Sequence, residues 1–196
     1  MNTGINTDAI DQILKCIIDN LNSNFYYLYS PATGPSLLKR YKNHTLDNFV
    51  KKTVIEERLN KYPVWVLPLL VGLNENDPSD IDYKDEKKMK HWMLAIVQPN
   101  RGLVEIFDSF ARPTHMNFWG EIIKQWMQIF CSNKEILVRS FSGQRRHQNG
   151  GLNCGLWVCL YLVLWGNGNN ITEIENHEKC TENEVETFKY FITVKK

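Results

Sequence analysis

The sequence predicts a single α+β domain, residues 1–196, with a mostly antiparallel central sheet flanked by helices. Three observations favour this fold class. Helical patterns lie at both ends of the chain, β-rich segments are grouped in its middle, and the two do not alternate regularly. A length of 196 residues suits one domain, and 43% hydrophobic residues exclude a disordered or fibrous chain.

An amphipathic helix opens the chain. Thr7 and Asp8 provide a start signal. The apolar residues that follow share one helical face: Ile10, Ile13, Leu14, Ile17, Ile18 and Leu21. Residues 25–29 then have the composition of a short strand.

The next part of the chain leads to a second strand. Gly34 and Pro35 predict a loop, and a weaker helical pattern covers residues 46–59. Residues 64–71 are apolar and rich in β-forming side chains. Because Pro68 has no backbone N–H, we expect the end of this strand at a sheet edge or a bulge.

Two further β-rich segments predict a hairpin. Residues 92–97 and 103–107 are joined by a turn at residues 99–102 that contains Pro and Gly. Ahead of them, residues 74–90 are rich in Asp and Lys and show no apolar period. We expect that segment to be a solvated loop.

Three helices and one strand are predicted in the last 80 residues. The helices cover residues 118–130, 154–165 and 184–191, and the strand covers residues 135–141. The helix at 154–165 is apolar, and we expect it to be buried on most sides. Its apolar run is about half the length that a membrane-spanning helix requires.

Charge and cysteine content exclude several function classes. The net charge of +1 points to neither nucleic acid nor an anionic membrane as a partner. The N-terminus lacks the basic and apolar regions of a signal peptide. An odd number of irregularly spaced cysteines, with no CxxC pair, favours free thiols in a reducing compartment, cytoplasmic or nuclear. These cysteines are Cys16, Cys131, Cys154, Cys159 and Cys180.

A histidine and a carboxylate flank the predicted hairpin. His91 comes immediately before its first strand, and Asp108 comes immediately after its second. Because a hairpin returns the chain to the same edge of the sheet, we expect the two side chains within hydrogen-bonding reach. An imidazole backed by a carboxylate is a general base held in one tautomer.

Cys154 lies where a reactive thiol is favoured. It follows Gly150 and Gly151 and opens the apolar helix, at the positive end of the helix dipole. The glycines let a substrate backbone come close, and the first backbone N–H groups of the helix can stabilise an oxyanion. Gln148, six residues upstream, carries an amide donor suited to the same oxyanion. A nucleophile, a base, an orienting acid and an oxyanion donor are the groups that acyl transfer requires.

These residues resemble those of the ubiquitin-like-protein proteases, the clan of SUMO- and ubiquitin-deconjugating and adenoviral-type cysteine proteases. The motifs that carry the resemblance are His91-Trp92, Asp108-Ser109 and Gln148 through Cys159. The family has the same chain order of His, Asp, Gln and Cys, with the Gln six residues before the Cys. Residues 5–8 with the following helix, and the strand that contains Pro68, match the family as well.

The resemblance implies a papain-like cysteine protease fold and a thiol-dependent hydrolase. By this analogy His91 is the base, Asp108 orients it, Cys154 is the nucleophile and Gln148 is the oxyanion donor. Trp92 then roofs a narrow tunnel for a Gly-Gly tail.

The implied reaction is cleavage after the C-terminal glycine of a ubiquitin-like modifier, in isopeptide deconjugation or precursor processing. The modifier is SUMO, ubiquitin or a relative, and its conjugates are the partners. We expect Gly150, Gly151 and Asn153 to bind substrate, no cofactor or metal, and a monomer that binds neither nucleic acid nor membrane.

Three features depart from the family pattern and leave the modifier open. Ile5 stands where the family has a tunnel tryptophan, and Asn153 stands where it has Asp before the nucleophile. Asn149, Gly150 and Gly151 replace a Pro-Asn-Gly stretch. The chain is rich in Asn, Lys and Ile, as expected of an AT-rich genome, and a pathogen effector acting in a host cytosol fits this composition.

Other interpretations remain open at this stage. His147 is a rival base, and His147 with Cys154 and Cys159 is a candidate zinc site without standard ligand spacing. His44, His115 and His177 are expected on the surface or in loops. The same clan contains viral endopeptidases of structural proteins and pathogen acetyltransferases that use the same triad. An inactive module that only binds a modifier is the alternative outside enzymes.

Overall fold

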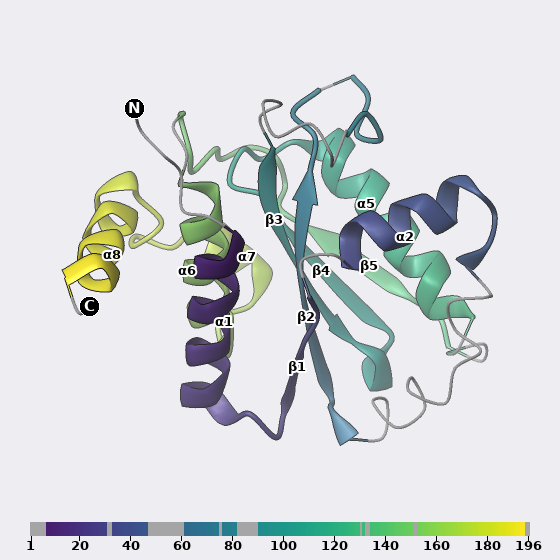
Figure 1. The fold of residues 1–196 in the computed structure, drawn as a ribbon, viewed down its shortest axis with the longest axis horizontal. Helices are drawn as coiled ribbons and strands as arrows, with labels where there is room; N and C mark the ends of the chain where they lie inside the picture. Colours follow the sequence, from purple (N-terminus) through teal and green to yellow (C-terminus); the bar gives the residue numbers. More distant parts are fainter. Residues whose placement is uncertain are drawn as a thin grey trace.

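A computed structural model describes residues 7–30, 33–46, 61–74, 76–81, 90–129, 131, 134–150 and 153–194. They form a mixed five-stranded sheet with helices on both faces, which confirms the α+β class (Figure 1). The strands are β1 (Tyr26–Leu28), β2 (Val64–Val71), β3 (His91–Gln98), β4 (Leu103–Phe107) and β5 (Leu137–Ser140). The α-helices are α1 (Thr7–Asn22), α2 (Thr33–Lys42), α5 (Pro113–Gln128), α6 (Cys154–Gly166), α7 (Ile171–Glu175) and α8 (Glu182–Val194).

The strands lie in chain order, and their pairing changes from the centre to the edges. β3 pairs antiparallel with both β2 and β4, as expected, and the predicted hairpin is formed by β3 and β4 around a short 3₁₀ turn. The edge strands β1 and β5 pair in parallel with β2 and β4. β1 covers β2 only over Val64–Val66. Pro68 therefore lies beyond the part of β2 that pairs with β1, so its missing N–H removes no hydrogen bond to β1.

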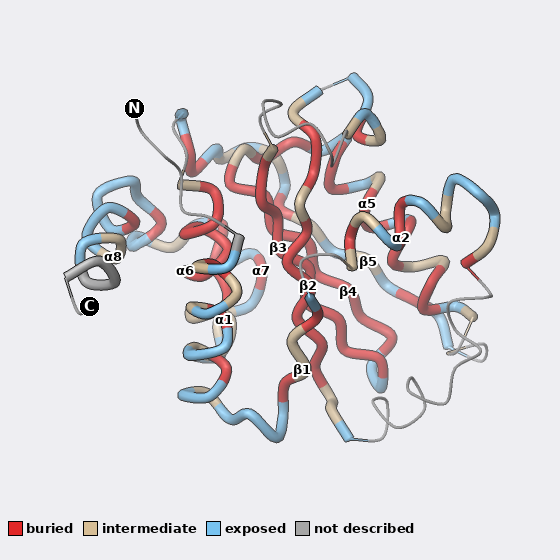
Figure 2. The backbone as a smooth tube through the Cα atoms, in the orientation of Figure 1, coloured by how far each residue is buried: buried red, intermediate tan, exposed pale blue. Residues whose placement is uncertain are grey.

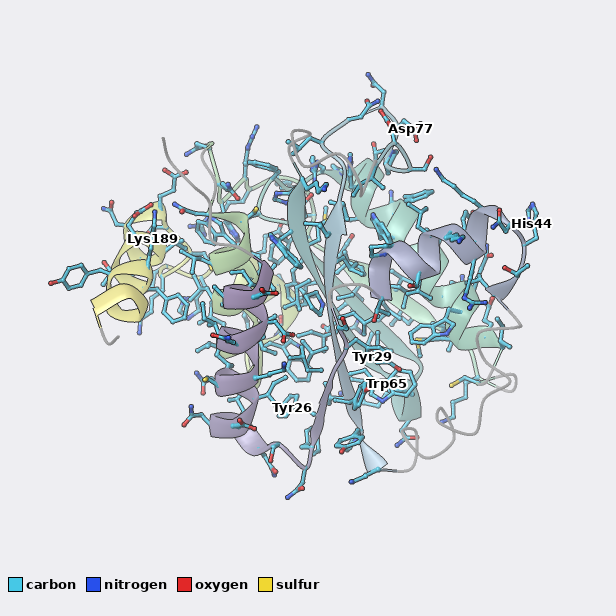
Figure 3. The ribbon with its side chains drawn as sticks, viewed as in Figure 1. Tyr26, Tyr29, His44, Trp65, Asp77 and Lys189 are labelled. Carbon is cyan, nitrogen blue, oxygen red and sulfur yellow. The ribbon has the colours of Figure 1, made fainter. Side chains whose placement is uncertain are left out.

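Two layers of helices enclose the sheet. α1, α6, α7 and α8 lie on one side, and α2 and α5 lie on the other (Figure 1). Burial is concentrated in the central strands and in α6, whereas α8 is exposed over most of its outer surface (Figure 2). On the α5 side, Trp126 of α5 packs against Trp65 of β2 and against Tyr29, with ring centroids 5.7 Å apart in each pair. Tyr29 and Trp65 are labelled in Figure 3.

Two glycines let α1 lie directly against α6. A Cβ at Gly155 would lie 2.5 Å from Ile10 Cδ1, and one at Gly166 would lie 2.4 Å from Leu21 Cδ1. Gly155 and Gly166 are about three helical turns apart on α6, and their partners Ile10 and Leu21 are about three turns apart on α1. The two helices therefore run side by side in the same direction. This packing explains why glycine follows Cys154 inside the first turn of α6.

Several predicted elements differ from the structure. Residues 33–42 form α2 and not a loop, because Pro35 lies in the first turn, where its fixed φ and missing N–H are tolerated. The five-residue helix α7 was not predicted; a capping box between Asn170 and Glu173 stabilises it. The strand predicted at 135–141 is limited to β5. Most of the helix predicted at 46–59 lies outside the described residues.

Two further expectations concern the cysteines and membrane-spanning helices. All five cysteines are free thiols, as predicted. No helix in the described part of the chain has the length and apolar surface needed to cross a membrane.

Candidate active site

The hairpin brings His91 and Asp108 together at one edge of the sheet. His91 begins β3, and Asp108 follows the last residue of β4. The distance between His91 Nε2 and Asp108 Oδ1 is 2.7 Å, and the two side chains are only 1% and 0% exposed. The Phe110 ring stacks on the imidazole, with centroids 4.4 Å apart. The imidazole is therefore held in place by a hydrogen bond at its edge and by a ring on its face.

Arg112 completes the surroundings of Asp108. Its Nε donates to Asp108 Oδ2 at 2.9 Å, and its Nη1 donates to the Gly72 carbonyl at 3.3 Å. The Phe110 backbone N–H donates to Asp108 Oδ1 at 3.0 Å. Burial alone would raise the pKa of Asp108, but the His91 hydrogen bond and the charges of His91 and Arg112 hold it well below its usual range. Sequence reasoning missed Arg112; its spacing of four residues from Asp108 was the available signal.

Cys154 lies at the N-terminus of α6, as expected, within hydrogen-bonding reach of His91. Because His91 Nε2 is engaged by Asp108, Nδ1 is the ring nitrogen available to the sulfur. Burial raises the pKa of the Cys154 thiol, but the His91 hydrogen bond and charge, with the N–H groups of Trp92 and Gly155, lower it overall. Burial lowers the pKa of His91, while its bonds to Asp108 and Cys154 raise it overall. Both directions favour a thiolate–imidazolium pair.

Gln148 is buried and oriented by its neighbours. Its Oε1 accepts a hydrogen bond from Ser109 Oγ at 2.8 Å, so its Nε2 is the end directed at the loop before Cys154. That Nε2 donates to the Gly150 carbonyl at 3.1 Å. The Ser109 carbonyl also accepts the Gln148 backbone N–H at 2.9 Å. Ser109, which directly follows Asp108, therefore links the Asp108 segment to Gln148. Sequence reasoning did not assign this role.

The predicted substrate-binding residues have different surroundings. Trp92 is 6% exposed on β3, and Gly150 is exposed, with open space where a Cβ would be. Asn153 points its side chain to α8, where Nδ2 donates to Glu186 Oε1 at 2.5 Å. Gly151 and Ile5 lie outside the described residues.

His147, the rival base, has a structural role. His147 is 4% exposed, and its ring nitrogens hydrogen-bond to the Tyr161 hydroxyl at 2.7 Å and to the Glu175 carbonyl at 2.8 Å. His147 therefore joins α6 to α7 and has no nitrogen left for base catalysis. The surface assignment of His115 was wrong, because this residue is fully buried on α5, and burial lowers its pKa to about 4. Cys159 is fully buried, and burial raises its pKa.

Metal chemistry was the other alternative at this site. Across the residues that the structure describes, no three His, Cys, Asp or Glu side chains are grouped so as to hold a metal ion. His147, Cys154 and Cys159 in particular do not form such a group.

Comparison with known sequences identifies the family. Residues 85–195, which include His91, Asp108, Gln148 and Cys154, match the Ulp1 protease family, C-terminal catalytic domain. The chain belongs to the Ulp1 protease family. It is therefore a cysteine protease, as the resemblance implied. No curated protein matches the sequence of this Ulp1-family protease.

Solved structures share the fold at low sequence identity. The Chlamydia trachomatis effector protein Cdu1 bound to ubiquitin is 13% identical with a TM-score of 0.62; the match covers 99% of this Ulp1-family chain and 93% of that one. A de-sumoylating protease is 14% identical with a TM-score of 0.62, over 97% and 80% of the two chains. The Ulp1 protease domain in complex with Smt3, the yeast ortholog of SUMO, is 13% identical with a TM-score of 0.55, over 88% and 71%.

Proposed function

We propose that this protease cleaves the bond after the C-terminal glycine of a ubiquitin-like modifier, with Cys154, His91, Asp108 and Gln148 as its catalytic residues. The observation that carries the proposal is the buried pair of His91 and Asp108 beside a thiol whose pKa is lowered. A thiolate next to an oriented imidazole is the nucleophile and acid–base pair of thiol proteolysis.

The first half of the proposed reaction is acylation. The Cys154 thiolate attacks the carbonyl carbon of the modifier's terminal glycine, and the carbonyl oxygen becomes an oxyanion. The Gln148 amide and the Cys154 backbone N–H donate hydrogen bonds to this oxyanion. The C–N bond then breaks, and the His91 imidazolium gives its proton to the leaving amine. The products are a thioester on Cys154 and a free amine.

Hydrolysis of the thioester completes the cycle. Neutral His91 takes a proton from water, and the resulting hydroxide attacks the thioester carbonyl. The C–S bond breaks, which regenerates the thiolate beside the imidazolium and releases the modifier as a carboxylic acid that loses its proton to solvent. Asp108 stays ionised throughout, because its pKa is held low, and it stabilises the charged ring.

The choice of a modifier as substrate is supported by the relatives of the fold. One structural neighbour is bound to ubiquitin, and another is bound to the yeast ortholog of SUMO. The free thiols suit a reducing compartment, so we place the activity in a cytosol or nucleus, including the host cytosol if the source is a pathogen.

Covalent capture tests the proposal. Ubiquitin and SUMO carrying a C-terminal electrophile are incubated separately with wild type, Cys154→Ala and, as a matched thiol control, Cys159→Ala. We expect wild type and Cys159→Ala to gain the mass of at least one modifier, and Cys154→Ala to gain none. Equal labelling of Cys154→Ala contradicts the nucleophile assignment.

The remaining functions are distinguished by covalent capture together with parallel assays of acetyl transfer and of protein cleavage. Binding of a modifier without covalent capture or turnover indicates an inactive module. Acetyl transfer from acetyl-CoA to a protein substrate, without modifier cleavage, indicates an acetyltransferase. Cleavage of viral structural proteins alone indicates an endopeptidase.

A further inference from the structure

The helix α8 contacts both ends of the loop that leads to the nucleophile. Asn149, directly after Gln148, donates its backbone N–H to Glu182 Oε1 at 2.8 Å. Asn153, directly before Cys154, donates its side-chain Nδ2 to Glu186 Oε1 at 2.5 Å. Glu182 and Glu186 are one helical turn apart and therefore share a face of α8.

A lysine on the same helix strengthens the second contact. Lys189 Nζ lies 3.5 Å from Asn153 Oδ1 and 3.7 Å from Glu186 Oε2. The amide of Asn153 is thus bound at both its nitrogen and its oxygen by α8, on which Lys189 is labelled in Figure 3. α8 itself is held against the body of the protein by buried Val185 and half-buried Phe188.

The orientation of Asn153 has a consequence for α6. An Asn at the N-cap ordinarily accepts a hydrogen bond from a backbone N–H of the first turn. Within the described part of the chain, the Asn153 side chain makes no such cap, because it is turned toward α8. The Cys154 and Gly155 N–H groups are therefore not taken by the N-cap side chain and remain available to the sulfur and to an oxyanion, whereas the Leu156 N–H donates to the Asn153 backbone carbonyl.

We propose that Glu182 and Glu186 of α8 are positioning residues for Asn149 and Asn153, the residues next to Gln148 and Cys154. They act through Asn149 and Asn153 and touch no reacting atom. This inference rests on the proposed function, since Asn149 and Asn153 directly adjoin Gln148 and Cys154, the two residues proposed to donate to the tetrahedral intermediate. α8 would thus set the efficiency of acylation without changing the ionisation of Cys154.

The two carboxylates are exposed, so their hydrogen bonds contribute little to global stability. Positioning of an oxyanion donor is more demanding, since a displacement of about 1 Å can cost about 100-fold in rate. We therefore expect Glu182→Ala/Glu186→Ala to lower kcat by about 10- to 100-fold, with KM and Tm close to wild type. Glu182→Gln/Glu186→Gln retains a carbonyl oxygen at each position and should recover most of kcat.

The controls separate this role from a structural one. Glu184→Ala removes a charge from the opposite side of α8 and should leave kcat unchanged. Alkylation of Cys154 by iodoacetamide needs the thiolate and no oxyanion donor, so its rate in Glu182→Ala/Glu186→Ala should equal that of wild type. Slower alkylation would show that α8 acts on the thiol, which overturns the inference.

Hydrogen exchange tests the contact between Glu182 and Asn149 without any substrate. The Asn149 amide should exchange at least about tenfold faster in Glu182→Ala than in wild type or in Glu184→Ala, because its acceptor is lost. Unchanged exchange, or full kcat in the double variant, overturns the inference. A wild type that captures no modifier refutes the proposed function instead, and the exchange result still decides whether α8 holds the loop.

Discussion

Arg112 donates its Nε–H to the Oδ2 atom of Asp108 across 2.9 Å, and both side chains are buried. The other carboxylate oxygen of Asp108, Oδ1, is hydrogen-bonded to His91 Nε2. One carboxylate is thus shared between an imidazole, which changes its charge in the proposed mechanism, and a guanidinium, which does not. The direction in which Asp108 presents an oxygen to His91 depends on both partners.

Replacement of Arg112 should damage stability and turnover together. In Arg112→Ala the buried carboxylate loses a charged partner, which should cost about 3 kcal/mol in the free energy of unfolding. We expect Arg112→Lys to lie between wild type and Arg112→Ala, because the ammonium keeps the charge but lacks the planar fork that also reaches the Gly72 carbonyl. Urea unfolding and steady-state turnover measure the two effects. Arg139→Ala, at an exposed position of β5, is the control, and wild-type stability of Arg112→Ala would refute this account.

The reactivity of Cys154 should follow pH in a way that depends on His91. The folded thiol has a pKa below its ordinary value of 9.0, because the His91 hydrogen bond and charge outweigh burial. The alkylation rate of Cys154 should therefore reach half its maximum below pH 9.0, since only the thiolate reacts. In His91→Ala only burial and the backbone N–H groups remain, and the inflection should move to higher pH. Mass spectrometry of the Cys154 peptide, with the urea-unfolded chain as reference, measures both curves; identical curves for wild type and His91→Ala would contradict the assignment.

Ser109 should act only through Gln148. Ser109→Ala removes the hydroxyl that holds the Gln148 carbonyl end, so the amide can turn and its donor end is no longer fixed. We expect kcat to fall about tenfold with KM little changed, against a fall of about 100-fold or more for Gln148→Ala. The double variant should be no slower than Gln148→Ala alone, because the two residues act as one unit. Additive losses in this cycle would mean that Ser109 has a separate role.

Gly155 should tolerate no larger side chain. The Cβ of Gly155→Ala would lie 2.5 Å from Ile10 Cδ1 and 2.7 Å from Ile10 Cγ1, so either the buried Ile10 side chain or α1 as a whole must shift. We expect a loss of about 1–3 kcal/mol in the free energy of unfolding, measured in urea. Gly150→Ala is the matched control, since its Cβ meets nothing within 4 Å. In an Ile10→Val background, which removes Cδ1, the cost of Gly155→Ala should be smaller; an equal cost would place the strain elsewhere.

Local patterns predicted the parts of the site that belong to single elements. The hairpin between His91 and Asp108 closes over a few residues, and the start of α6 is encoded by glycines followed by an apolar run. The proximity of His91 to Asp108 and the position of Cys154 at the start of a helix could therefore be expected from local patterns, whereas the placement of that helix beside His91 was implied only by the family resemblance. The loop predicted at residues 34 and 35 failed because proline is compatible both with a turn and with the first turn of a helix.

The sequence by itself determined the chemical groups, their order and the edge of the sheet at which two of them meet, because strand and helix ends follow from local periodicity. Only the tertiary structure decided which groups support them. Glu186 meets Asn153 across 33 residues, Ser109 meets Gln148 across 39, and His147 is turned away from catalysis by Tyr161 and Glu175. Such contacts depend on how helices pack against the sheet and on which buried polar groups need partners, and neither condition leaves a periodic signal in the chain.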